Sequence, residues 1–432
     1  MTESKRDFYG LGIAPGILEI LAKLHFKIPT PIQEQSIPIA IEGKDLMGIA
    51  QTGTGKTLAF GIPLIQHVLN GKGSGLVIAP TRELALQIDE TFRKVGMSLN
   101  LRTAVLIGGE SIGRQIRDLH RSPQVVIGTP GRIIDHLTQR TLSLQKVSIL
   151  VLDEADRMLD MGFAPQLNRI LSILPKNKQT MLFSATMPQS IVDIAKAYLK
   201  LPIRVEIARS GTTVKDVTQE LFFVTQEEKP RLLEKLLQEY RGSVLVFSRT
   251  KYSAKKITSL VRALGHKSAE IHGNRSLGQR KEALEGFKTG RYRVLVATDI
   301  AARGIDVTNI ELVLNYDLPE NAEDYVHRIG RTARAGTSGH AISFARPNQF
   351  QDVRAIERLI RKTLPVSKIP TLPPPVPFKF KMDSSESRFT PRGRGSSYHS
   401  QPGRSGSSRP GGYRNPRFGG NRSRSNSFRG RR

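Results

Sequence analysis

Short apolar runs recur along the first half of the chain, each too short for a free-standing helix. They read LVIAP at 76–80, VVIGTP at 125–130, ILVLDEAD at 149–156 and TMLFSAT at 180–186. Each is rich in Val, Ile or Leu, and helix-like stretches such as TRELALQIDETFRKV lie between them. Continuous rather than alternating apolarity is typical of strands buried on both faces, so the pattern predicts a parallel sheet with crossover helices.

The same pattern restarts in the second half of the chain. The runs there are SVLVFSRT at 243–250, RVLVATD at 293–299 and LVLNYDLP at 312–319. The segment between the halves, at 208–219, is polar and has no apolar period, so it is expected to be a linker. We therefore predict two α/β domains, at 1–207 and 220–365.

The C-terminal region has a different composition. IPTLPPPVPFKF at 369–380 is proline-rich and expected to be extended, and no Leu, Ile, Val or Ala follows Met382. Such a segment cannot bury a core, so 366–432 is predicted to be a tail that is first Pro-rich and then rich in Arg, Gly and Ser, and disordered.

Charge and cysteine content narrow the class of protein. The net charge is +28, with twelve arginines and two acids after Met382, and a polyanionic partner, most readily nucleic acid, is expected. The chain has no cysteine, which excludes disulfides and thiolate metal sites. It begins without the apolar core of a signal peptide and has no run of roughly 18 apolar residues, so a soluble cytoplasmic protein is expected.

The segment AQTGTGKT at 50–57 fits a P-loop, with Ala50 in place of the usual first glycine. Its glycines let backbone N–H groups turn toward phosphate, and a helix beginning near Lys56 adds its positive end. Lys56 supplies charge to the β- and γ-phosphates, and the Thr57 hydroxyl can ligate Mg²⁺. The complete Gly-Lys-Thr ending disfavours the alternative, a glycine-rich turn before a helix.

Two acids follow the strand predicted from Ile149 to Leu152. The carboxyl ends of strands are where α/β sheets place ligands, and acids beside a nucleoside triphosphate need a cation. Asp153 is therefore expected to bind Mg²⁺, and Glu154 to orient and polarise the attacking water. Helix capping is the alternative, weaker for two acids downstream of a P-loop.

Asp153-Glu154-Ala155-Asp156 spells the motif that names the DEAD-box RNA helicases. The chain resembles this family from about Phe8 to about Ala345, and its overall pattern resembles the bacterial RhlE-like subgroup with a basic tail. The resemblance implies two tandem RecA-like domains with parallel sheets, with ATP and Mg²⁺ as cofactors and RNA as partner.

FKIPTPIQ at 26–33 is similar to the family's Q motif, with Phe8 as the isolated aromatic before it and His25 where the family often has Gly. The Gln33 amide has the donor and acceptor that adenine requires, and Phe26 can stack on the base. The ATP-binding residues predicted in this half are Phe26, Thr30, Gln33, Ala50, Gln51, Thr52, Gly53, Thr54, Gly55, Lys56 and Thr57.

PTREL at 80–84, the glycine pair at 108–109 and TPGR at 129–132 resemble the family's contacts to the RNA backbone. Donors to phosphate oxygens hold a strand without reading its bases. The residues so assigned are Pro80, Thr81, Arg82, Gly108, Gly109, Thr129, Pro130, Gly131 and Arg132.

SAT at 184–186 is similar to the motif that links nucleotide state to RNA unwinding. The Ser184 and Thr186 hydroxyls are expected to hydrogen-bond Asp153 and Glu154. Asp156, Ser184 and Thr186 are accordingly predicted to couple the two ligands.

The second half has no P-loop. FSRTK at 247–251, HGNRSLGQR at 272–280 and VATDIAARGID at 296–306 resemble that half's nucleic-acid and ATP contacts, and Leu277 departs from them where the family usually has Gln. The resemblance assigns Arg249, Gly273, Arg280 and Thr298 to RNA, and Gly304 and Asp306 to ATP.

HRIGRTAR at 327–334 spaces Arg328, Arg331 and Arg334 three residues apart, on one side of a predicted helical turn. It resembles the family's last motif, in which Arg331 and Arg334 act as arginine fingers. His327 and Arg328 are predicted to contact acids and couple the motifs. The predicted catalytic residues are Lys56, Asp153, Glu154, Arg331 and Arg334, and the predicted metal ligands are Thr57 and Asp153.

These assignments predict an RNA-dependent ATPase that locally unwinds or remodels RNA duplexes and RNA–protein complexes as two domains close. Its partners are expected to be RNA, bound through the backbone, and ribosomal or messenger ribonucleoprotein, with no membrane and a monomeric chain. Two alternatives stay open, an ATP-gated RNA clamp or annealing chaperone, and a DNA-directed motor.

Overall fold

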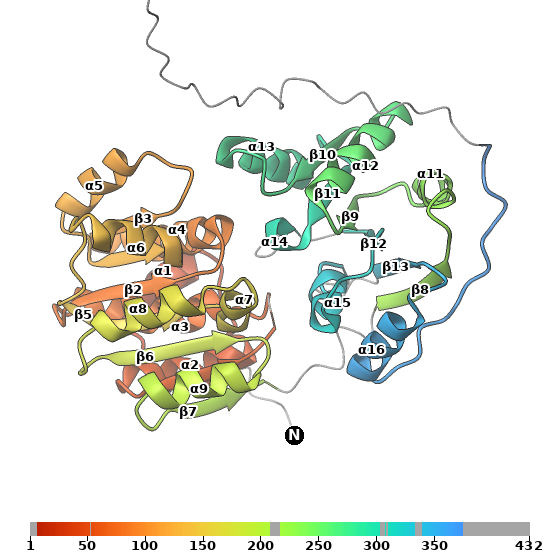
Figure 1. The fold of residues 1–432 in the computed structure, drawn as a ribbon. Coiled ribbons are helices and arrows are strands. Elements are labelled where there is room, and N and C mark those ends of the chain that lie inside the picture. The colour runs from red at the N-terminus through yellow and green to blue at the C-terminus, as the bar shows by residue number, and fades with distance from the viewer. Residues whose placement is uncertain are drawn as a thin grey trace, which may run out of the picture. The chain divides into compact units, whose positions relative to one another are not determined.

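The computed structural model describes residues 7–51, 53–207, 217–302, 307, 310–332 and 339–374. Within them, seven parallel strands form the sheet of the first domain in the order β3-β4-β2-β5-β6-β1-β7, with helices covering it (Figure 1). The strands are β1 (Leu46–Ile49), β2 (Ser74–Ile78), β3 (Thr103–Leu106), β4 (Val125–Gly128), β5 (Val147–Leu152), β6 (Gln179–Ser184) and β7 (Ile203–Glu206). The helices are α1 (Pro15–Lys23), α2 (Pro31–Ile41), α3 (Lys56–Leu69), α4 (Arg82–Gly96), α5 (Ile112–His120), α6 (Pro130–Thr138), α7 (Ala155–Asp160), α8 (Ala164–Ile173) and α9 (Gln189–Tyr198), with a 3₁₀ turn at Met97–Leu99.

The second domain repeats this architecture with six parallel strands in the order β10-β11-β9-β12-β13-β8. Its strands are β8 (Val217–Phe223), β9 (Val244–Ser248), β10 (Ser268–Ile271), β11 (Val294–Thr298), β12 (Leu312–Asn315) and β13 (Gly339–Ala345). Its helices are α11 (Lys229–Glu239), α12 (Lys251–Ala263), α13 (Leu277–Lys288), α14 (Asp299–Ala302), α15 (Ala322–Ile329) and α16 (Phe350–Ile360). The predicted fold class, two α/β domains with parallel sheets, is confirmed.

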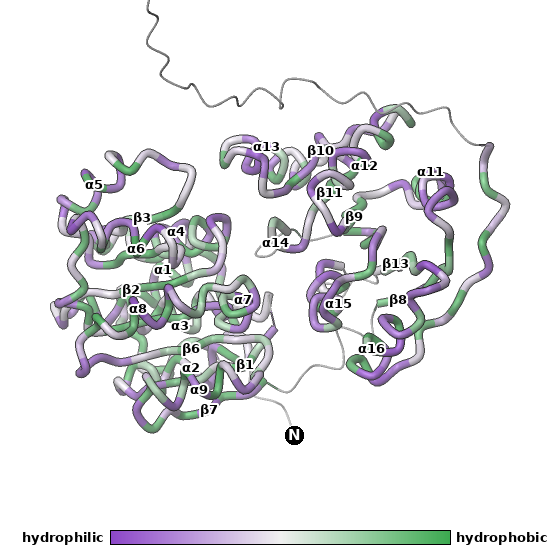
Figure 2. The backbone as a smooth tube through the Cα atoms, in the orientation of Figure 1, coloured by the Kyte–Doolittle hydropathy of each residue, from purple (hydrophilic) through white to green (hydrophobic). Residues whose placement is uncertain are grey.

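Successive residues of one strand contribute to different cores. Ile149 and Val151 of β5 belong to the core beneath α1 to α4, whereas Leu150 and Leu152 belong to the core beneath α6 to α9. This burial on both faces is the physical reason for the continuous apolar runs. In both domains hydrophobic residues concentrate along the strands, while α15 is largely hydrophilic (Figure 2).

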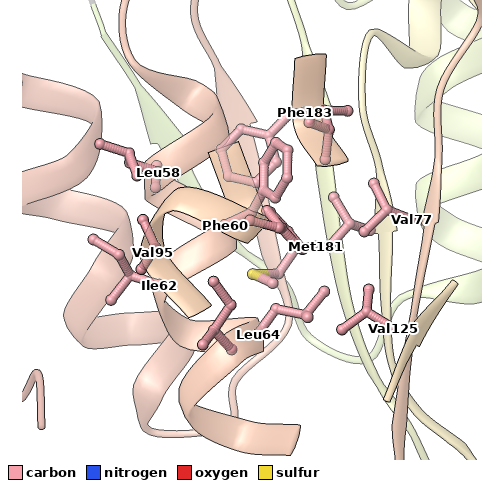
Figure 3. Packing of buried hydrophobic residues seen from close by; sticks show 14 of the residues in the cluster. Leu58, Phe60, Ile62, Leu64, Val77, Val95, Val125, Met181 and Phe183 are labelled. Carbon is pink, nitrogen blue, oxygen red and sulfur yellow. The ribbon is translucent and has the colours of Figure 1, made fainter. Parts of the chain in front are cut away.

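Aromatic packing fixes the height of α3 above the sheet. The Phe60 ring centroid lies 5.4 Å from that of Phe183 (Figure 3). It lies 6.2 Å from the centroid of the Phe92 ring. A Cβ on Gly48 of β1 would meet the Phe183 ring at 2.5 Å, so this strand position requires glycine. The packing places the loop before α3, which holds the P-loop residues, at the carboxyl end of β1.

Two predicted boundaries differ from the structure. Val217, Thr218 and Gln219 belong to β8 and pair with β13, because β-branched and alternating side chains suit a strand, so the linker does not extend to residue 219. The rest of that predicted linker, 208–216, lies outside the described residues.

The beginning of the predicted tail also differs. Ser367 N donates to Leu221 O at 2.9 Å, and Arg231 Nε donates to Pro373 O at 2.7 Å. Ile369 and Leu372 pack against the core beneath α11. Residues 366–374 therefore belong to the second domain, and the tail predicted beyond them, 375–432, lies outside the described residues.

Candidate functional site

The candidate site follows the carboxyl edge of the first sheet, where neighbouring strands bring the predicted motifs together. Ala50 N, after β1, donates to Ser184 O of β6 at 3.0 Å. Asp153 N, after β5, donates to Ile78 O of β2 at 3.0 Å. The sheet order therefore places the P-loop, SAT, the DEAD residues and the start of PTREL in one row.

The P-loop ends in a left-handed turn before α3. Gly53 and Gly55 have φ angles of 85° and 91°, a region that side chains disfavour. Lys56 is buried, and its Nζ donates to Ala50 O at 2.8 Å, while Thr54 Oγ1 donates to Gln51 O at 2.7 Å. Thr57 lies one residue into α3, half-buried, and Thr52 lies outside the described residues.

Gln33 connects the Q motif to the P-loop. Its Oε1 accepts from Thr30 N at 2.9 Å, and its Nε2 donates to Gly55 O at 3.0 Å. The amide keeps one further donor and one further acceptor position for a base. Phe26 is 42% exposed and free to receive a ring, whereas Phe8 is buried in the core beneath α1 to α4.

Asp153 is almost completely buried at the end of β5. Burial raises the pKa of Asp153 to about 7, the Lys56 ammonium opposes that shift, and the neighbouring Glu154 reinforces it. No salt bridge involves Asp153 among the residues that the structure describes. A desolvated carboxyl of this kind is a cation-binding group, because a cation would stabilise the ionised form.

Glu154 occupies a strained position. Its φ of 50° and ψ of 49° are left-handed, although it carries a side chain, and such strain concentrates at functional sites. Arg157 Nη1 donates to Glu154 Oε2 at 2.9 Å, and both side chains are buried. Sequence reasoning missed Arg157, whose three-residue spacing from Glu154 on α7 was the available signal.

Asp156 holds the SAT residues. Its Oδ2 accepts from Thr186 N and Thr186 Oγ1, each at 2.8 Å, and from Ala185 N at 3.1 Å. Asp156 N donates to Ser184 Oγ at 3.3 Å. The prediction that these hydroxyls bond Asp153 and Glu154 was wrong, because α7 turns the fourth residue of the motif, not the first two, toward β6.

Arg82 lies against the glycine pair. A Cβ on Gly108 would meet Arg82 Nη2 at 3.0 Å, and one on Gly109, whose φ is 81°, would meet Nη1 more closely still. Thr81, which follows Pro80, caps α4 by accepting from Leu84 N at 3.2 Å. These residues follow β2 and β3, so the carboxyl edge of the sheet next to the DEAD residues carries the Arg82 guanidinium beside glycine backbone.

Arg132 extends this edge from α6, which begins with Pro130 and Gly131 after the N-cap Thr129. Its Nη1 donates to Gln115 Oε1 at 3.2 Å, and Gln115 is buried. The same Oε1 lies 3.0 Å from His136 Nε2, and Gln115 Nε2 donates to Ile107 O at 2.9 Å. Sequence reasoning missed Gln115 and His136, which orient Arg132, because neither belongs to a recognisable motif.

In the second domain, Arg249, Gly273 and Thr298 lie at the carboxyl ends of β9, β10 and β11, and Arg280 lies in the first turns of α13, which begins at Leu277. Arg249 is exposed, and its backbone N donates to Asp317 Oδ2 at 3.1 Å. Asp317 Oδ1 pairs with the buried Lys229 at 2.8 Å.

Arg328 is the buried centre of this second edge. Its Nε and Nη2 donate to the two carboxylate oxygens of Asp299 at 2.6 and 2.7 Å, and its Nη1 donates to Asn315 Oδ1 at 3.0 Å. The guanidinium also lies 5.0 Å from the centroid of the Phe247 ring. Arg328 thereby connects α15, on which it lies, to α14 and β12.

The arginine spacing does not continue as a helix. α15 ends at Ile329 and Gly330 is its C-cap, so Arg331 lies in a turn, not on the helical face predicted for all three arginines. Arg331 is buried, and its Nε donates to the carbonyl of His327 at 3.2 Å. Gly304, Asp306 and Arg334 lie outside the described residues.

Two observations bear on other classes of site. Among the described helices, none is both long and apolar enough to cross a membrane. Within the same residues, no group of three or more His, Cys, Asp and Glu side chains is arranged to hold a metal ion.

The model of the DEAD/DEAH box helicase family matches residues 30–194, and that of the helicase conserved C-terminal domain matches 228–336. The chain belongs to the DEAD-box family of ATP-dependent RNA helicases.

Its relatives include the ATP-dependent rRNA helicase RRP3 of Debaryomyces hansenii, 42% identical over 370 residues, which span 85% of this chain and 78% of that protein. The RRP3 of Candida albicans is 43% identical, over 83% of this chain and 68% of its own length. These relatives are fungal and do not support the predicted bacterial RhlE-like subgroup.

Solved structures of similar proteins share the fold. Saccharomyces cerevisiae Dbp5 bound to RNA and ADP BeF3 is 31% identical with a TM-score of 0.74, covering 84% of this chain and 95% of its own. Mss116p bound to ssRNA and AMP-PNP is 28% identical with a TM-score of 0.76, covering 83% of this chain and 78% of its own.

Proposed function

We propose that this chain is an RNA-dependent ATPase that locally separates RNA strands, or removes proteins from RNA, when ATP and RNA together close its two domains. The observation that carries the proposal is the row of motifs along the first sheet: P-loop, SAT, DEAD residues, then Arg82 and Arg132. The Asp156–Thr186 hydrogen bonds lie in the middle of that row.

In the proposed reaction, Gln33 and Phe26 hold adenine, and the P-loop amides with Lys56 hold the phosphates. Glu154 orients the attacking water. Arg331, supplied by the other domain, stabilises charge on the γ-phosphate, a role worth on the order of 10³–10⁵ in rate. Gly304, Asp306 and Arg334 stay predicted contributors to the same site.

The donor set of Asp153 and Thr57 suits Mg²⁺, because a desolvated carboxyl and a hydroxyl beside the nucleotide phosphates are the oxygen ligands this ion takes. When bound, Mg²⁺ would neutralise phosphate charge. The Lys56 ammonium, which opposes the rise in the pKa of Asp153, would favour the ionised carboxylate that binds such a cation.

Arg82, Arg132, Arg249, Arg280 and the adjoining glycines are proposed to hold the RNA backbone without reading bases. Because both domains supply such donors and both contribute to the ATP site, each ligand should tighten the other. The relatives named rRNA helicases support ribosomal RNA as the substrate class. The cytoplasmic location and monomeric state stay predictions, to be checked by fractionation and sedimentation.

The test is steady-state ATP hydrolysis with and without single-stranded RNA, for the unaltered chain, Glu154→Gln and Arg331→Ala. We expect strong RNA stimulation that both substitutions abolish. RNA-independent hydrolysis that survives Arg331→Ala would show that the second domain does not complete the site, and would overturn the proposal. Replacing the RNA by DNA of the same sequence excludes a DNA-directed motor if stimulation is lost.

A further inference from the structure

A groove of about 630 Å³ in the second domain belongs to none of the motifs described above. It lies along the end of α16 and the residues that follow. Four cationic side chains line it, Arg354, Arg358, Arg361 and Lys362, together with one acid, Glu357. All four cations are exposed.

The groove has a net positive charge because four cations line it and only one acid does, and the nearby carboxylates hydrogen-bond neutral donors and form no ion pair with these cations among the described residues. Glu357 Oε1 accepts from Leu364 N at 2.9 Å, and Asp352 Oδ2 accepts from Gln349 Nε2 at 3.1 Å. Over the described part of the chain, none of the four cations forms a salt bridge. An unneutralised cluster of this kind attracts a polyanion.

One of the cations packs on an aromatic ring, and another occupies a strained backbone position. The Arg354 guanidinium lies 4.8 Å from the centroid of the Phe350 ring, and that ring stacks on Phe223 with a centroid distance of 6.2 Å. Arg361 has a φ of 53° at the C-cap of α16, a position where glycine is favoured. An arginine there is retained at a cost of about 1 kcal/mol in backbone strain.

The helix dipole explains only part of this cluster. Cations in the last turn of a helix are stabilised by its negative end, typically by about 0.3–1 kcal/mol, and this accounts for Arg358 and its C-terminal neighbours. Arg354 lies a full turn earlier, on the same side of α16 as Arg358. The cations therefore continue beyond the reach of the dipole.

The groove is separate from the RNA residues already assigned. Val353 and Ile356 fix α16 to the core formed with β8, β13 and α15. Arg249, Gly273 and Thr298 instead follow β9, β10 and β11, and the strand order puts β8 and β13 at the opposite edge of the sheet (Figure 1).

We propose that this groove is a second RNA-binding site, which holds the phosphate backbone of a segment flanking the strand at the motifs. The proposal rests on RNA being the substrate. Four solvated donors without an apolar anchor suit a flexible phosphate chain better than a folded acidic protein. Such a site would favour long or structured RNA without adding sequence preference.

The test compares the full-length triple variant Arg354→Gln, Arg358→Gln, Lys362→Gln with a control that removes the same charge from exposed lysines of the first domain, Lys72→Gln, Lys176→Gln, Lys196→Gln. Binding is measured by fluorescence anisotropy to a single strand of about 10 nucleotides, within the range of site sizes of OB-fold domains that bind single strands, and to one of about 30 nucleotides. Thermal unfolding checks that each variant folds.

We expect the groove variant to bind the long RNA about tenfold more weakly at low salt. Its salt slope should be shallower by about two to three, because each removed cation leaves about one phosphate without its neutralising partner. Short-RNA binding and ATPase at saturating short RNA should change less than twofold. The control should bind both RNAs like the unaltered chain.

Equal weakening for both lengths, equal weakening by the control, or unchanged long-RNA binding would each overturn the groove proposal. If the unaltered chain neither binds short RNA nor shows RNA-stimulated ATPase, the proposed function fails instead, which keeps the two failures distinguishable.

Discussion

One acid at the carboxyl end of the first sheet differs from the paired acids of both domains, since Glu154 forms an ion pair with Arg157 whereas Asp153 forms none among the described residues. In the first domain Asp153 is buried without a salt bridge among the described residues, and its pKa is raised to about 7. In the second domain Asp299 and Asp317 are each paired, with Arg328 and Lys229. One domain thus leaves an acid available for a ligand, whereas the other uses its acids to hold cations rigidly.

Asp153 therefore gives the first domain a buried acid that a cation could bind, in keeping with the proposed nucleotide site. A buried ionised acid without an ion-pair partner lowers the free energy of unfolding, and binding of a cation to that acid would raise it again. In the second domain Asp299 instead forms an ion pair with the buried Arg328, which connects α14 to α15.

The largest expected effect comes from removing the Arg328–Asp299 ion pair of the second domain. Arg328→Ala leaves Asp299 without its bidentate partner, and removing one member of a buried ion pair costs roughly 3–5 kcal/mol. Urea denaturation followed by far-UV circular dichroism should show the second domain unfolding earlier. The control is Lys94→Ala, whose pair with Glu90 is exposed on both sides and worth at most about 0.5 kcal/mol. Similar losses for both variants would contradict the comparison.

Asp153→Asn should act in the opposite direction and stabilise the nucleotide-free protein. The pKa of Asp153 in the folded protein is about 7, above its ordinary value of 3.8, so the unfolded chain ionises this residue at lower pH than the folded one. The folded protein therefore keeps its full stability below about pH 4 and loses stability as the pH rises from there toward 7. A shift of about three units corresponds to at most about 4 kcal/mol. Melting curves should show a higher Tm for the variant at pH 8 and little difference at pH 4.5. A lower Tm at pH 8 would refute the unpaired-acid account.

Arg157 tests whether the strained Glu154 needs its partner for catalysis. With Arg157→Met, the Glu154 carboxylate loses its hydrogen bond, and we expect kcat of the RNA-stimulated ATPase to fall about tenfold through misorientation. KM for ATP should stay within about twofold, and Arg157→Lys should restore part of kcat. A rise in KM at unchanged kcat would assign Arg157 to binding instead.

The smallest expected effect comes from removing a threonine helix cap, which both domains have. Thr81 caps α4 through Leu84 N at 3.2 Å, and Thr250 caps α12 through Ser253 N at 3.0 Å. Each Thr→Ala change should cost about 1 kcal/mol, measured by urea unfolding. Only Thr81→Ala should also weaken RNA binding. If Thr250→Ala weakens RNA binding as strongly, the caps matter for orientation in both domains.

The sequence predicted those buried strands whose residues form continuous runs of Val, Ile and Leu. The runs that became β2, β4, β5, β6, β9, β11 and β12 were continuous and apolar. Strands such as β1, with Gly48 inside, and β10, with Ser268 and Glu270, carry no such run and were not predicted. Their place is set by neighbours in the sheet, which a local pattern does not contain.

The sequence predicted those site residues that belong to recognisable motifs. Asp156 was expected to act with Ser184 and Thr186, yet the acids proposed as their partners were the wrong ones, since that depends on how α7 leaves β5. Gln115 and His136 could not be found, because their roles come from packing between α5 and α6.

We propose that ATP and RNA are coupled through the Asp156–Thr186 hydrogen bonds. The direct measurement is the affinity for single-stranded RNA with and without AMP-PNP, in the unaltered chain and in Thr186→Val. We predict that AMP-PNP tightens RNA binding by at least about tenfold, within the usual range of coupling energies, and that Thr186→Val brings this factor close to one while each ligand alone binds as before. An undiminished factor in Thr186→Val would contradict the account.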